Sequence, residues 1–165
     1  MKKFLLSIVA TFLLAGNAHS FMSGVKPEKD GGAAIEILSG VIHTSPPGSN
    51  VNAGYGTIIN NTSNDIILTQ FRSPVFDSLE AHSMEYSAQG IAKMIHMHEL
   101  LIPANNEVRL TSGGLHLMFI GKRRDLTLGE EILVVTTDKK EVRYMLNLKV
   151  TDPRVGHNNH DHHMH

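Results

Sequence analysis

The sequence predicts an all-β protein, built as a sandwich or a barrel. Short runs of alternating apolar and polar residues recur along the chain, and the segments between them are rich in Gly, Pro, Asn, Asp and Ser, which favour turns. Beyond residue 20 no long helical periodicity occurs. The 165 residues are enough for one domain of ordinary size.

Nine strands are expected, each ending at a turn-forming segment. The clearest of these segments read TSPPGSN, NNTSND, IPANNE and TTDKKE. Successive side chains of a strand point to opposite faces, so each run offers one apolar face to a core. In chain order the expected strands span residues 34–43, 53–60, 65–71, 78–84, 93–101, 107–110, 115–120, 131–137 and 141–150.

Both ends of the chain differ from this pattern. Residues 1–20 look like a secretory signal, because Lys2 and Lys3 precede an apolar run too short to span a bilayer comfortably, and small residues follow it. Cleavage after Ala18 or after Ser20 fits this signal, and an uncleaved membrane anchor is the alternative. We therefore expect an exported protein with a flexible lead-in over residues 21–33, a β-domain over 34–151 and a His/Met-rich flexible tail over 152–165.

The composition excludes several classes of protein. Loss of Lys2 and Lys3 with the signal leaves 13 basic against 16 acidic residues and changes the net charge from −1 to −3, so the basic face of a nucleic-acid-binding protein is not expected. The chain has no Cys, which excludes disulfides and thiolate ligands. It has 11 His and 8 Met, so the candidate functional residues are of these two types.

Several His and Met residues lie two positions apart on the expected strands. The strand over residues 115–120 has one fully apolar face, whereas its other face carries His116 and Met118. Two further strands repeat this arrangement, with His82 and Met84 beside Glu80 on one and Met94, His96 and His98 on the other. Residues at i and i+2 of a strand are about 6–7 Å apart, so two such pairs from neighbouring strands would make a four-coordinate metal site.

These donors favour Cu(I). Thioether sulfur is a soft, neutral ligand, and soft ligands select Cu(I), whereas Zn(II) prefers thiolate, imidazole and carboxylate and Ca(II) prefers oxygen. The alternative is that the Met residues fill gaps in the core and that the His residues are unengaged surface groups. The pattern alone leaves both interpretations open.

The spacing of the candidate ligands along the chain is more specific. His82 and Ser83 are followed by ten residues, Met94, twenty-one residues and then His116-Leu117-Met118. This spacing, with the flanking segments LEAH, LLIPANNEVRL, GGLHLMFIG and DLTLGEEILVVTTD, resembles the signature of the PCu(A)C family of periplasmic copper chaperones. The resemblance covers roughly residues 35–150. One departure is that Ser83 occupies the position of an optional Met in the signature.

The resemblance implies a fold, a site and a role. The fold would be a cupredoxin-like β-barrel or sandwich in a single domain, and the role would be a periplasmic carrier in a Gram-negative bacterium. It would supply copper to the copper centres of cytochrome c oxidase, so its partners would be the copper ion and an acceptor such as an oxidase subunit or another copper chaperone. A monomer is expected. The implied Cu(I) ligands are His82, Met94, His116 and Met118.

Further His and Met residues lie outside the signature. Met84 is either a spare ligand or a hydrophobic wall, and His96 and His98 either extend the site towards solvent or are merely exposed. The last nine residues hold five His and one Met, and because imidazole binds Cu(II) well, a second site for Cu(II) is expected there, with an artificial tag as the alternative. The candidate ligands of the tail are His157, His160, His162, His163, Met164 and His165.

Three other roles remain to be weighed. The main alternative is a copper storage or resistance protein, which the many extra His residues would suit. An electron-transfer cupredoxin needs a Cys thiolate, which this chain lacks. An enzyme is not supported, because the sequence has no nucleotide-binding loop, no Cys nucleophile and no recognisable triad motif.

Overall fold

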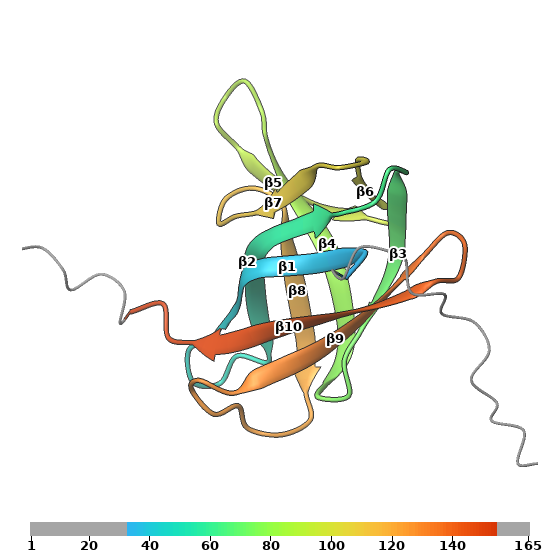
Figure 1. Cartoon of the computed structure of the whole chain (residues 1–165). Helices are drawn as coiled ribbons and strands as arrows, with labels where there is room; N and C mark the ends of the chain where they lie inside the picture. Colours follow the sequence, from blue (N-terminus) through green and yellow to red (C-terminus); the bar gives the residue numbers. More distant parts are fainter. Residues whose placement is uncertain (1–32, 155–165) are drawn as a thin grey trace, which may run out of the picture. The chain divides into compact units, whose positions relative to one another are not determined.

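The computed structural model describes residues 33–154, which form ten strands (Figure 1). No helix long and apolar enough to cross a membrane is present in this part of the chain. The strands are β1 (Ile35–His43), β2 (Val51–Asn60), β3 (Ile66–Arg72), β4 (Phe76–Tyr86), β5 (Ala92–Met97), β6 (Leu100–Ile102), β7 (Glu107–Leu110), β8 (His116–Lys122), β9 (Glu131–Asp138) and β10 (Arg143–Thr151).

Seven of these strands close into a barrel in the order β4-β8-β2-β1-β10-β9-β3. The barrel closes between β3 and β4, where Phe71 opposite Leu79 is the single residue pair that joins the two strands. β5, β6 and β7 are added at the edges of β4, β3 and β2 respectively. All pairs are antiparallel except β1 with β10. The prediction of an all-β sandwich or barrel is confirmed, and the structure is a barrel.

Alternation along the strands builds the core. On β8, Leu117 and Phe119 are fully buried, and the Phe119 ring meets Phe76 of β4 edge to face with ring centroids 5.1 Å apart. A Cβ atom at Gly54 of β2 would overlap the Phe119 ring, so only glycine leaves room for it there. This packing fixes β8 and turns its opposite side chains away from the apolar interior.

The prediction of a single strand over residues 93–101 is wrong, because two strands, β5 and β6, occupy this segment. β5 pairs with β4 and β6 pairs with β3, and the chain bends between them at His98 and Glu99. Since β3 and β4 meet at one residue pair only, the segment changes its partner strand at the bend. His98 therefore lies beyond the end of β5 rather than on the strand with Met94.

The other eight expected strands match observed ones to within two residues at each end. The expected β-domain over residues 34–151 contains all ten strands. The expected signal over 1–20 and nearly all of the lead-in over 21–33 lie outside the described residues, as does the tail beyond residue 154. Those assignments stay predictions.

Candidate metal centre

The pairing of β4 with its two neighbours brings the candidate residues together. His82 of β4 lies opposite His116 of β8 on one side and opposite His96 of β5 on the other. Two positions along β4, Met84 lies opposite Met94. The antiparallel register thus aligns residues from three segments of the chain on one surface of the barrel.

A cavity of about 310 Å³ lies next to this row of residues. Three of the predicted ligands, Met94, His116 and Met118, line it, and so does Met84. The other lining residues are Val51, Asn52, Ala53, Tyr55 and Gly113. His116 is only 7% exposed, whereas Met94 is 46% exposed, so the cavity has a buried imidazole on one side and a solvent-accessible thioether on the other.

His116 is held by the turn that precedes β8. Its Nδ1–H donates to the backbone carbonyl of Gly114, with 3.0 Å between the nitrogen and the oxygen. Gly113 has φ +76°, a left-handed conformation that glycine adopts without strain, and it allows the chain to turn just before the strand. With its proton on Nδ1, the imidazole keeps the lone pair of Nε2 free to bind a metal.

His82 is oriented by a carboxylate. Its Nε2–H donates to Oε2 of Glu80 over 2.8 Å, which leaves Nδ1 as the free nitrogen. That Nδ1 atom is buried and has no hydrogen-bond partner. An unsatisfied buried polar atom costs about 1–3 kcal/mol, so a metal ion at this nitrogen would remove a penalty. The His82 and His116 ring centroids are 6.1 Å apart, although His82 itself does not line the cavity.

The charge on Glu80 supports this arrangement. The hydrogen bond from His82 lowers the pKa of Glu80, and desolvation of the carboxylate partly opposes this effect. The nearby imidazoles of His96 and His82 and a hydrogen bond from Ser78 lower the pKa further. Glu80 is therefore an anionic acceptor at neutral pH, which is the role a carboxylate plays behind a metal-binding imidazole.

The donor set is soft and has no carboxylate in it. In residues 33–154, no three His, Asp or Glu side chains converge in a metal-binding arrangement. The predicted site would not produce such a group, because it contains two imidazoles and two thioethers. Such neutral nitrogen and sulfur donors suit a monovalent copper ion.

Some residues around the cavity were not identified from the sequence. The Tyr55 ring lies 6.4 Å from the His116 ring, and the His43 ring lies 4.8 Å from Tyr55. Their position depends on the pairing of β1, β2 and β8, which no local pattern reveals. The role of Glu80 did leave a signal, since its place two residues before His82 puts the two side chains on one face.

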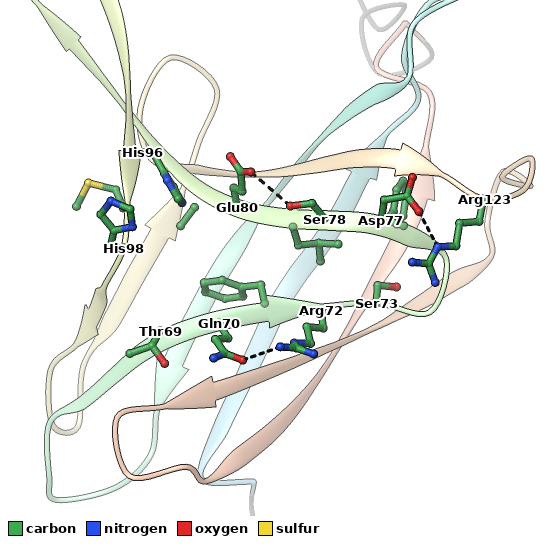
Figure 2. A pocket seen from close by; sticks show the side chains of 15 residues that line it. Thr69, Gln70, Arg72, Ser73, Asp77, Ser78, Glu80, His96, His98 and Arg123 are labelled. Carbon is green, nitrogen blue, oxygen red and sulfur yellow. Dashed lines mark hydrogen bonds and ion pairs between the residues drawn. The ribbon is translucent and has the colours of Figure 1, made fainter.

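The remaining candidates are distributed differently. His96 and His98 line a second cavity, of about 590 Å³, between β3 and β4 (Figure 2), rather than extending the first one. Met84 lines the first cavity, so both of its proposed roles remain open. The tail residues His157, His160, His162, His163, Met164 and His165 lie outside the described residues.

Comparison with known proteins identifies the fold independently. The copper-bound PCuAC domain from PmoF2 is 16% identical, with a TM-score of 0.58, and the match covers 73% of this chain and 94% of that domain. CuI-DR1885 from Deinococcus radiodurans is 23% identical, with a TM-score of 0.54, covering 70% of this chain and 76% of that one. Apo-DR1885 from Deinococcus radiodurans is 21% identical, with a TM-score of 0.55, and the match covers 92% of this chain and 97% of that one.

Sequence comparison identifies the family. No curated protein sequence matches the chain. A family model does match, over residues 35–150, and its description is "Putative lipoprotein LpqE-like". The matched region spans the barrel almost from its first strand to its last, and the resemblance to PCu(A)C domains seen in the sequence is confirmed. The chain therefore belongs to the LpqE-like family, and its barrel has the fold of PCuAC domains.

Proposed function

We propose that this protein is an exported copper chaperone that binds Cu(I) through His82, Met94, His116 and Met118. The observation that carries the proposal is the convergence of Met94, His116 and Met118 at one cavity. The His82 ring lies 6.1 Å from the His116 ring, and its buried Nδ1 has no hydrogen-bond partner. Family membership and fold support it, because solved domains with this fold are described as copper-bound or as Cu(I)-bound.

The two His ligands are the fixed part of the site. Glu80 holds His82 and the Gly114 carbonyl holds His116, so each imidazole presents one nitrogen in a set direction. A fixed pair of imidazoles needs little reorganisation when the ion arrives. The ion is the cargo of the protein, and these two residues hold it longest.

The Met ligands are the exchangeable part. Met94 is half exposed, and its unbranched side chain rotates easily. A donor from an acceptor protein replaces Met94 first, so that the ion passes through a mixed set of ligands and is never released free. The protein is thus a binding and transfer protein rather than an enzyme.

The acceptor in this proposal is a copper centre of cytochrome c oxidase, or another copper chaperone, in the periplasm. The alternative is storage or resistance, in which copper is retained. Mixing the Cu(I)-loaded protein with an apo oxidase copper domain distinguishes the two roles. Delivery predicts that copper appears on the oxidase domain, and retention on the loaded protein supports storage.

X-ray absorption of the Cu(I)-loaded protein tests the ligand set. Two sulfur and two nitrogen neighbours are expected from the four residues. A shell of nitrogen alone contradicts the proposed site, whatever the role of the protein.

A separate Cu(II) site is proposed for the tail, on the basis of its imidazole-rich sequence over residues 157–165. Deleting these residues should remove the Cu(II) that they bind, measured by electron paramagnetic resonance, and leave Cu(I) binding intact. An unchanged Cu(II) stoichiometry after the deletion contradicts this part of the proposal.

A further inference from the structure

The second cavity has imidazole groups at one end only. Figure 2 shows His96 and His98 next to each other, with Glu80 extending from the neighbouring strand, whereas Asp77 and Arg123 lie at the opposite end. Asp77 is already engaged, because its Oδ1 accepts from Nε of Arg123 over 2.8 Å. The chemistry at the imidazole end is therefore set by His96, His98 and Glu80.

These two imidazoles are close together and accessible. Their ring centroids are 4.5 Å apart, and both residues are exposed. The His96 ring also stacks on His82, with centroids 5.3 Å apart, so a continuous series of imidazoles connects the two cavities. Two adjacent, exposed imidazoles can each provide a nitrogen ligand to the same cation.

Glu80 has one oxygen to spare for such a cation. Its Oε2 accepts the hydrogen bond from His82, whereas Oε1 accepts only a long hydrogen bond from Ser78, at 3.4 Å. A cation at Oε1 displaces Ser78 and leaves the bond to His82 in place. The carboxylate can then serve both cavities at the same time.

This donor set differs from that of the first cavity. It combines two imidazole nitrogens and an anionic oxygen. The thioether of Met97 also lines this cavity, but Met97 is partly buried and packs against the core, so it is not one of the proposed ligands. Imidazole and carboxylate donors suit divalent ions, with Cu(II) the most strongly bound of the first-row series. We propose that His96, His98 and Oε1 of Glu80 form a second metal subsite, for a Cu(II) ion. This inference goes beyond the proposed Cu(I) function and does not depend on it.

In this proposal, the three side chains come together only when the ion binds. The three side chains do not converge in a metal-binding arrangement within residues 33–154. His98 lies in the bend after β5, outside regular pairing, and both imidazoles are exposed, so they reorient without disturbing the core. Binding therefore fixes the bend, and water supplies the remaining ligands.

The test uses the chain without residues 157–165, so that tail imidazoles contribute nothing. The deletion keeps all ten strands and every buried residue of the hydrophobic core. Cu(II) is added alone and followed by electron paramagnetic resonance. One equivalent should bind with nitrogen superhyperfine coupling, and His96→Ala with His98→Ala should weaken binding at least about 100-fold, since loss of outer-shell partners alone costs 10–100-fold.

Two controls make the outcome decisive. His43→Ala removes a half-buried imidazole that lines neither cavity, and it should leave Cu(II) binding unchanged. Cu(I) affinity, measured separately with a coloured chelator, should be unchanged in the double variant, so that failure of the two proposals is distinguishable. Equal Cu(II) binding by the double variant, or no Cu(II) binding by the tail-free chain, overturns the inference.

Discussion

The two cavities flank the same strand, β4, yet they offer opposite chemistry. The smaller one has three thioethers and a buried imidazole, whereas the larger one has two exposed imidazoles, the carboxylate of Glu80, an ion pair and a single thioether, that of Met97. The difference comes from the neighbouring strands. β8 brings His116 and Met118 to one side of His82, whereas the end of β5 brings His96 and His98 to the other.

The comparison shows that donor type and accessibility change together across β4. In the two proposals above, the soft, partly buried cavity holds Cu(I) and the polar, open cavity holds Cu(II). Glu80 and His82 are the residues that both sides share, since Glu80 contacts His82 and lines the larger cavity. Variants on each side, and at the shared residue, test whether the two cavities really are separate in function.

The largest effect is expected when the soft cavity loses two ligands. His116→Ala with Met118→Ala should weaken Cu(I) binding by at least about 100-fold, because half of the proposed ligands are gone. Chelator competition measures this affinity. Cu(II) binding by the tail-free chain should stay at the wild-type level, and a parallel loss of both ions would show that the cavities form one site.

A smaller effect on both ions is expected at the shared carboxylate. Glu80→Gln removes the anionic acceptor behind His82 and a proposed ligand of the open cavity, so Cu(I) and Cu(II) should each bind roughly tenfold more weakly. Asp77→Asn is the matched control, because Asp77 lines the same cavity but pairs with Arg123. If Glu80→Gln changes neither affinity, the shared role of Glu80 is wrong.

The two Met residues of the β4–β5 pair should differ from each other. Met94→Leu keeps the side-chain volume and removes one thioether, which should weaken Cu(I) binding roughly tenfold, or about 1.4 kcal/mol. Met84→Leu should change it less than about threefold if Met84 is a wall of the cavity. Equal losses for the two variants would make Met84 a ligand as well.

The smallest effect is expected far from both cavities, at Tyr144 of β10. Burial, and then the hydrogen bond to Asp138, raise the pKa of Tyr144 from the ordinary value of 10.0 to about 12. A raised pKa means that the folded state favours the neutral phenol, so this stability is present below pH 10 and is lost as the pH rises from 10 to 12.

Tyr144→Phe should therefore remove this alkaline loss of stability. At neutral pH it should lower the free energy of unfolding by about 1 kcal/mol, the typical net value of one hydrogen bond. Denaturant unfolding at pH 7 and pH 11 measures both changes. Metal affinities should be unaltered, and a change in them would contradict the separation of barrel stability from metal binding.

Much of the barrel could be predicted from the sequence because its signals are local. Leu117 and Phe119 of β8 are buried, as are Leu146 and Leu148 of β10. In both strands the alternation of apolar and polar residues can be recognised within a few consecutive positions. The division between β5 and β6 could not be predicted in this way. It depends on the partner strand of each half, and His98 at the bend has no local turn signal.

The candidate site was predictable in its members but not in its arrangement. The resemblance of the chain spacing to the PCu(A)C signature implied His82, Met94, His116 and Met118 as candidate ligands. The position of His82 between His116 and His96 follows from inter-strand register, which local patterns do not contain. For the same reason the sequence left open whether His96 extends the Met94 site, and the structure shows that it stacks on His82 and lines the second cavity.

The closure of the barrel by one residue pair has a consequence for local unfolding. Phe71 and Leu79 are the only paired residues between β3 and β4 among those described, so few inter-strand hydrogen bonds hold this line of the barrel. Backbone amides on both strands here should exchange with solvent through small openings that cost less than global unfolding. β8, paired with β2 and β4 on its two sides, keeps its protection during such openings. The line between β3 and β4 is thus the place where the barrel opens first, while the strand that carries His116 and Met118 stays closed.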